Sequence, residues 1–188
     1  MLIGVTGRGG AGKSTLAKNF VKRNPTFSYI EVDLLVETIV FKSERLLDKA
    51  NMVMNTDIYT IEDIIKSYFK TDLQSRVLHQ CFLEEVERTI NETIINLNSG
   101  NTIIDWFLLH KLHLFGKCDY KILVIEDRDK RIKRIQTREN QSIQTFLKVD
   151  EYYTDCNKDT VDLVTNSRIS IESLEKKILK KVSTDLET

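Results

Sequence analysis

Near the start of the chain stands Gly7-Arg8-Gly9-Gly10-Ala11-Gly12-Lys13-Ser14, between the apolar run Leu2-Ile3-Gly4-Val5 and the helix-forming segment Thr15–Phe20. These eight residues satisfy the pattern G-x-x-x-x-G-K-[ST], which requires a strand before it and a helix after it. Glycines allow the backbone to turn tightly enough to direct successive N–H groups inward. The helix that begins near Lys13 adds its positive end to those N–H groups. The stretch therefore predicts a phosphate-binding loop.

Such a loop binds the phosphates of a nucleoside triphosphate, here expected to be ATP with Mg²⁺. The Lys13 ammonium is expected to reach the β- and γ-phosphates and to act in catalysis, and the Ser14 hydroxyl to ligate Mg²⁺. The nucleotide is expected to contact the whole loop and the residue after it, namely Gly7, Arg8, Gly9, Gly10, Ala11, Gly12, Lys13, Ser14 and Thr15.

The rest of the chain alternates between strand-like and helix-like segments. Short runs rich in β-branched residues occur at 2–5, 27–32, 102–105, 120–126 and 162–165. Because these runs are almost continuously apolar, they are typical of parallel strands covered on both faces, which need helical crossovers. The pattern predicts an α/β protein with the three-layer α/β/α P-loop NTPase fold, a parallel five-stranded sheet, a helical insert and a lid.

The chain offers no internal boundary, because its 188 residues contain one proline, Pro25, and no repeat or low-complexity linker. We expect one kinase domain over residues 1–188. The stretch 34–98 is too long for one crossover, so it predicts a helical insert that binds the acceptor. Within it, apolar residues recur at helical spacing from Leu73 to Ile94, with Thr71 or Asp72 as the start signal and Gly100 as the stop signal.

Charge and hydropathy limit the partners. Lys plus Arg and Asp plus Glu both total 28, so the formal net charge is zero and nothing in it favours nucleic acid or an anionic membrane. The apolar runs are far shorter than the roughly 20 residues of a bilayer span, and no signal peptide is recognisable. The three cysteines lack metal or disulfide spacing. We expect a cytoplasmic protein, a monomer or a weak homo-oligomer, whose partner is a small-molecule acceptor.

Two aspartates follow predicted strands. Asp33 ends Glu31-Val32-Asp33, about 20 residues after the loop lysine, and at the carboxyl edge of such a sheet it would serve as catalytic base. The alternative is that Asp33 only caps the helix that follows it. Asp105 ends Thr102-Ile103-Ile104-Asp105 and is either a Walker B carboxylate or an ordinary residue after a strand.

Four arginines follow the fourth predicted strand, and Arg131, Arg134 and Arg138 share one helix face by their spacing, with Arg128 nearby. They either face the phosphates beneath a lid at about 138–158 or form a solvated basic face. His79 is expected to pack in the long helix, and no metal is assigned to His110 and His113, which lack a partner at zinc spacing. Trp106 and Phe107 could line an acceptor pocket or belong to the core.

With these motifs in place, the sequence resembles the dephospho-coenzyme A kinase family along most of its length. That family opens with a strand into T-G-x-x-G-S-G-K-S, which is similar to residues 6–14 here. Its second strand ends in D-A-D, where this chain has Glu31-Val32-Asp33. A family stretch of the form d-x-P-L-L-F-E, followed by a short helix and C-D, aligns without a gap on residues 105–111 and Cys118-Asp119. Its R-x-x-x-R-D resembles residues 134–139, and its closing A-D-x-x-I-x-N resembles residues 161–166, one residue shorter.

The resemblance implies ATP-dependent phosphorylation of the ribose 3′-hydroxyl of dephospho-coenzyme A, with Asp33 as base, Arg138 as a catalytic residue on the phosphates and Asn166 near the nucleotide base. The chain departs from the family at Phe107 and Lys111, which replace the proline and glutamate of P-L-L-F-E, and at His79-Gln80, which replaces an H-P pair. The expected lid arginine is missing.

Two alternatives remain open. A nucleoside or nucleotide kinase would use the same loop and carboxylate, but it normally shows an aromatic or arginine signature after the second strand, which Asp33-Leu34-Leu35 does not supply. A nucleotide-binding regulator with little transferase activity would fit the altered lid, whereas the retained Lys13, Ser14, Asp33 and Arg138 favour an enzyme.

Overall fold

Five parallel strands form the centre of the structure, a computed structural model that describes residues 1–56, 59–98, 100–137 and 142–186. Their order across the sheet is β2-β3-β1-β4-β5, and every neighbouring pair is parallel. This confirms the predicted α/β architecture. The strands are β1 (Leu2–Thr6), β2 (Ser28–Glu31), β3 (Thr102–Asp105), β4 (Tyr120–Val124) and β5 (Leu163–Thr165).

The predicted ends of two strands are wrong. The strand expected at 27–32 stops at Glu31, and Val32 and Asp33 already belong to helix α2 (Val32–Thr38). Val32 is fully buried in the core below the sheet, so its apolar β-branched side chain looked like one more strand residue. The strand expected at 120–126 likewise stops at Val124.

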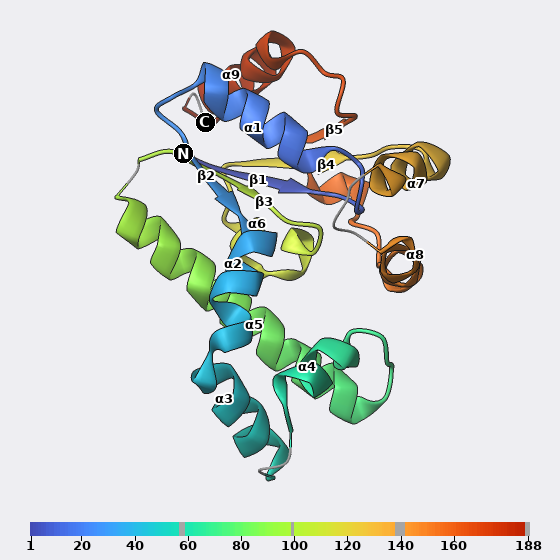
Figure 1. The fold of residues 1–188 in the computed structure, drawn as a ribbon. Coiled ribbons are helices and arrows are strands. Elements are labelled where there is room, and N and C mark those ends of the chain that lie inside the picture. Colours follow the sequence, from blue (N-terminus) through green and yellow to red (C-terminus); the bar gives the residue numbers. More distant parts are fainter. Residues whose placement is uncertain (57–58, 99, 138–141, 187–188) are drawn as a thin grey trace.

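Helices cover both faces of the sheet (Figure 1). On one face, Leu16 and Phe20 of α1 and Leu174 and Ile178 of α9 pack with the strand residue Val5. On the other face, residues of α2, α5 and α6 share a second core with β2 and β3. Helices α7 and α8 lie at the end of the sheet where the strand arrows point (Figure 1). The remaining α-helices of the described chain are α1 (Lys13–Arg23), α3 (Glu44–Met54), α4 (Ile61–Ser67), α5 (Leu73–Leu97), α6 (His113–Gly116), α7 (Arg128–Gln136), α8 (Ile143–Tyr152) and α9 (Ile171–Leu186). Three short 3₁₀ helices lie at Val40–Lys42, Leu109–Lys111 and Lys158–Thr160.

Helices α2 to α5 lie between β2 and β3 in the chain, and α3 and α4 extend away from the sheet (Figure 1). The 25-residue α5 contacts α2, α3 and α4. It begins where the start signal predicted, because the Asp72 carboxylate accepts a hydrogen bond from the Ser75 N–H at 2.9 Å. It ends earlier than Gly100 predicted, since Asn98 adopts a left-handed conformation (φ 44°) as its last cap.

One buried acid holds the insert together. Glu85 of α5 is 2% exposed and accepts hydrogen bonds from the Ser43 hydroxyl at 2.8 Å and from the Arg88 guanidinium at 2.6 and 3.0 Å. Burial pushes the pKa of Glu85 upward, but the bonds from Arg88 and Ser43 outweigh it, so the pKa lies below its usual range. Ser43 also caps α3, so one carboxylate joins α3 to α5.

The described residues include no helix with the length and apolar character that a membrane crossing requires. The three cysteines, Cys81, Cys118 and Cys156, are buried free thiols.

Candidate active site

The glycine-rich loop connects β1 to α1 in a conformation that only glycine adopts without strain. Gly7 has φ +137°, and a Cβ there would stand 2.2 Å from the Val124 carbonyl oxygen. Gly12 has φ +98°, and its Cβ would stand 2.4 Å from Cβ of Ser167, in the loop after β5. Neither position therefore accepts a side chain, and the loop is packed between β4 and the β5–α9 connection.

Two arginines of α7 hold the backbone of this loop. Arg131 donates to the Gly9 carbonyl at 3.2 Å, and Arg134 donates to the Gly10 and Ala11 carbonyls at 3.1 and 3.2 Å. Because the C=O and the following N–H of a trans peptide point in opposite directions, these bonds direct the Gly10 and Gly12 N–H groups away from α7. Such inward N–H groups at the start of α1 are what an anionic phosphate requires.

The sequence left open whether Arg131 and Arg134 face phosphates or solvent, and the structure gives a third result. Both lie on one face of α7, as their spacing predicted, but each is paired with an acid. Arg134 donates to Glu126 at 2.7 Å, and the buried Arg131 donates to Asp150 at 3.1 Å. Arg138 lies outside the described residues.

Lys13, the first residue of α1, lies along the loop. It is only 7% exposed, and its ammonium donates to the Arg8 carbonyl at 3.3 Å. Lys13 and Ser14 both line a cavity of about 580 Å³ at the carboxyl end of the sheet, together with Gly9, Gly10 and Gly12 of the loop. Five of the nine residues predicted to contact the nucleotide therefore border one cavity, whereas Gly7, Arg8, Ala11 and Thr15 do not line it.

Asp33 lies in the first turn of α2 and opens into the same cavity. Although Asp33 is exposed as a residue, desolvation of its carboxylate is the largest influence on its pKa and raises it from 3.8 to about 6, whereas the nearby Lys13 ammonium lowers it. The negative charge of Asp105 contributes to the rise, whereas the Trp106 indole N–H opposes it. A carboxylate with a pKa near neutrality and a position beside the loop lysine has the properties of a general base.

Asp105, at the end of β3, is 3% exposed and accepts a hydrogen bond from the Tyr29 hydroxyl at 2.9 Å. Burial and the Asp105 charge raise the pKa of Tyr29, while its hydrogen bond with Ser14 lowers it, so these three side chains form one polar group. Hydroxyl and carboxylate oxygens are the ligands that Mg²⁺ prefers. Ser14, with Asp33 and Asp105 nearby, therefore fits a magnesium ion bound to nucleotide phosphates. No cluster of three or more His, Cys, Asp or Glu that could hold a metal by itself occurs in the described part of the chain.

A second, smaller cavity of about 160 Å³ adjoins the first. Asp33, Val36, Phe41, Phe107 and Val149 line both cavities. The smaller cavity extends into the insert. Besides aliphatic residues it is lined by seven rings, those of Phe41, Tyr68, Phe69, His79, Phe82, Trp106 and Phe107. Phe107 therefore borders the site, one of the two readings left open for it, whereas Trp106 is 1% exposed and also belongs to the core. His79 packs beside Tyr68 and Phe82, as expected.

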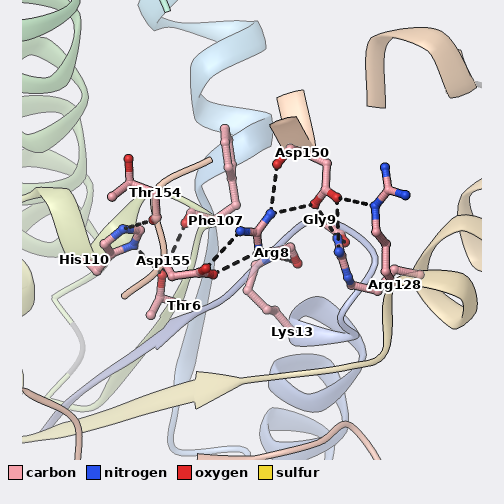
Figure 2. Close-up of polar contacts among 11 residues, drawn as sticks. Thr6, Arg8, Gly9, Lys13, Phe107, His110, Arg128, Asp150, Thr154 and Asp155 are labelled. Carbon is pink, nitrogen blue, oxygen red and sulfur yellow. Dashed lines mark hydrogen bonds and ion pairs between the residues drawn. The ribbon is translucent and has the colours of Figure 1, made fainter. Parts of the chain in front are cut away.

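Arg8, the second residue of the loop, extends toward α8 and the segment after it (Figure 2). Its guanidinium makes two hydrogen bonds of 2.9 Å to the Asp155 carboxylate and one of 2.8 Å to the Asp150 carbonyl. Phe146 of α8 packs so close to the loop that a Cβ on Gly9 would stand 3.1 Å from its ring. Sequence reasoning missed Asp150, Asp155 and Phe146, because no motif marks them.

Two further predicted residues lie at the margins. Asn166 is exposed in the loop after β5, where its side-chain oxygen accepts from the Arg168 N–H at 2.9 Å, and its neighbour Ser167 packs against Gly12. The His110 ring is hydrogen-bonded on both sides. Its Nε2 donates to the Thr154 carbonyl at 3.0 Å, which leaves Nδ1 to accept from the Thr6 hydroxyl at 3.1 Å (Figure 2). This histidine links β1 to the segment after α8.

The chain is similar to one protein family and to several solved structures. A family model described as dephospho-CoA kinase matches residues 1–152. The crystal structure of TT1252 from Thermus thermophilus is 22% identical, with 99% of this chain and 97% of that chain covered and a TM-score of 0.66. Shikimate kinase from Bacteroides thetaiotaomicron is 13% identical over 100% and 99% of the two chains, with a TM-score of 0.52. Deoxyadenosine kinase from M. mycoides, bound to its products, is 15% identical over 98% and 100%, also with a TM-score of 0.52. At these identities the structural matches support the fold alone.

Proposed function

Because the chain belongs to the dephospho-CoA kinase family, a family of ATP-dependent kinases, we propose that it transfers the γ-phosphate of ATP to the ribose 3′-hydroxyl of dephospho-coenzyme A. The observation that carries this proposal is the position of Asp33. It lines both the cavity that contains the phosphate loop and the aromatic cavity of the insert. A base at this junction can reach an acceptor hydroxyl in one cavity while the phosphates occupy the other.

The loop and Lys13 bind and orient the triphosphate. N–H groups of the loop and the start of α1 bind its oxygens, and the Lys13 ammonium neutralises charge on the β- and γ-phosphates. When bound, Mg²⁺ would be held by Ser14, with Asp33 and Asp105 close by, and would neutralise further charge on the phosphates. Arg138 is proposed to contact the transferring phosphoryl group, and Asn166 the nucleotide base.

Asp33 accepts the proton of the acceptor hydroxyl. As the hydroxyl oxygen bonds to the γ-phosphorus, the bond from that phosphorus to the β–γ bridging oxygen breaks, and ADP leaves with the electron pair. The raised pKa of Asp33 suits this proton transfer. A carboxylate with a pKa of about 6 binds the proton more firmly than an ordinary aspartate, yet it remains mostly ionised at pH 7.

The aromatic cavity is proposed to bind part of the acceptor. Two of its polar atoms, the Tyr68 hydroxyl and His79 Nδ1, are buried without a hydrogen-bond partner among the described residues. Burial lowers the pKa of His79, so its ring is neutral at pH 7. Stacking rings with two unused polar atoms favour a flat heteroaromatic group such as a nucleobase. We further propose a single domain in the cytoplasm, a monomer or weak homo-oligomer, with an acceptor-binding insert at about 34–98 and a lid at about 138–158.

The test is turnover with a panel of acceptors. The protein is incubated with Mg-ATP and dephospho-coenzyme A, nucleosides, nucleoside monophosphates or no acceptor, and the phosphorylated product is separated and quantified. We expect product only with dephospho-coenzyme A, its loss in Lys13→Ala, and a reduction of at least about a hundredfold in Asp33→Asn. Product with another acceptor would overturn the substrate assignment and keep the kinase. ATP binding without product from any acceptor would favour the regulator.

A further inference from the structure

A buried carboxylate lies between the phosphate loop and α8. The side chain of Asp150 is 4% exposed, and three arginines donate to it: Arg131 through both terminal nitrogens, Arg8 at 3.3 Å and Arg128 at 3.4 Å. Arg131 also donates to the Gly9 carbonyl, so it contacts the loop and Asp150 through the same nitrogen. Asp150 is thus the point at which α7, α8 and the loop meet (Figure 2).

Arg8 makes a second connection to the same segment. Besides Asp150, its guanidinium binds the Asp155 carboxylate through two parallel hydrogen bonds and lies 4.8 Å from the centre of the Tyr153 ring. Two parallel bonds between arginine and a carboxylate fix both distance and orientation. Hydrogen bonds from Arg8 lower the pKa of Asp155, and the pKa of Arg8 is raised in turn, so both groups are ionised at neutral pH.

The side of α8 on which Arg8 lies matters for its role. Thr145, Phe146 and Val149 of α8 line the cavity of the phosphate loop. Arg8 instead lines a separate open cavity of about 540 Å³ on another side of the helix, together with Asp150. The Arg8 guanidinium is therefore engaged with α8 and the residues after it, although the Arg8 backbone belongs to the phosphate loop.

We propose that Asp150 and Asp155 are positioning residues for the phosphate loop: Asp155 acts through the Arg8 side chain, and Asp150 through Arg8 and Arg131. They hold the loop at a fixed distance from α8, so the loop N–H groups stand in their binding geometry before nucleotide arrives. Without these contacts, nucleotide must order the loop as it binds, and that cost weakens its affinity. The inference rests on the proposed nucleotide site and adds the residues that shape it.

The test is a double-mutant cycle on nucleotide affinity. Arg8→Gln, Asp155→Asn and the double variant are titrated with Mg-ADP by calorimetry, and the steady-state constants are measured with Mg-ATP and the acceptor. Asp155 is 73% exposed and Arg8 29%, so these changes leave the core intact. We expect each single variant to bind Mg-ADP about tenfold more weakly than the original protein. The double variant should bind as well as the single variant of lower affinity, because both changes remove the same interaction. For Asp155→Asn, the kcat at saturation and the KM for the acceptor should stay within about threefold of the original protein.

The control is Arg128→Gln. Arg128 also contacts Asp150, but its side chain is 63% exposed. Its affinity should change less than twofold. Asp150→Asn, measured alongside its melting temperature, should weaken Mg-ADP binding at least as much as Arg8→Gln. Single variants with unchanged affinity, or effects that simply add in the double variant, would overturn the inference. If the unmodified protein did not bind Mg-ADP, the proposed function itself would be wrong. The titration of the unmodified protein therefore separates that outcome from a failure of the positioning role.

Discussion

Acidification should reduce kcat/KM over a pH range that is set by the pKa of Asp33. With a pKa of about 6, this carboxylate is roughly 90% ionised at pH 7, half ionised at pH 6 and roughly 10% ionised at pH 5. If the ionised form is the base, kcat/KM falls about tenfold between pH 7 and pH 5. An aspartate at the ordinary value of 3.8 would remain more than roughly 90% ionised at pH 5, so the same change of pH would hardly affect it.

The measurement is initial-rate formation of the phosphorylated acceptor from pH 4.5 to 8.5, by direct separation of product so that no coupling enzyme limits the range. Mg²⁺ is kept in excess, and Mg-ADP affinity is measured at each pH, because the phosphates of the nucleotide also titrate near pH 6. Asp33→Asn is the control, and its residual kcat/KM, corrected for the measured change in Mg-ADP affinity, should not vary through pH 6. A wild-type kcat/KM that stays level down to pH 5 would refute the assignment of Asp33 as base.

Three further predictions concern stability, each measured by thermal or denaturant unfolding. Because the pKa of Asp33 is raised in the folded protein, its contribution is fully present below pH 3.8 and is lost as the pH rises through 6, so Asp33→Asn should raise the melting temperature at pH 8 but not at pH 3.5. The pKa of Glu85 is lowered, so Glu85→Gln should cost about 2 kcal/mol at pH 7 by weakening the bonds from Arg88, and the difference should shrink as the pH falls below 4.5. Gly12→Ala should lower the free energy of unfolding by about 1–3 kcal/mol and abolish Mg-ADP binding, since its φ is +98°, whereas Gly116→Ala, which has open space, should do neither. Equal stability of both glycine variants would contradict the strain argument.

Local sequence determined much of the fold and the centre of the site. The apolar runs placed all five strands, and the glycine pattern located the phosphate loop, because both depend on neighbours in the chain. The prediction that the second strand extends to Val32 was wrong for a physical reason. An apolar β-branched residue suits a buried strand and a buried first helical turn equally, and only tertiary packing decides between them.

The surroundings of the loop could not be predicted from local pattern. Asp150 and Asp155 are more than 140 residues from Arg8, and their contacts depend on how α8 docks, which no spacing rule describes. The arginines of α7 show the same limit. Their spacing gave the shared helix face, but the partners on that face, the loop carbonyls and Asp150, are set by the crossover from β4.

The length of α5 has a mechanical consequence. Its 25 residues span about 37 Å, and Val86 and Ile90 in its second half pack in the core beneath the sheet, while α3 and α4 rest on the half that extends away from it. The helix can thus act as a lever whose fulcrum is the buried stretch around Val86 and Ile90, about 20–25 Å from Leu73. A rotation of 10° about this fulcrum would move the far end of the helix by about 4 Å. Asp33 stands close to that fulcrum, so the insert could swing over an acceptor while the carboxylate itself hardly moved.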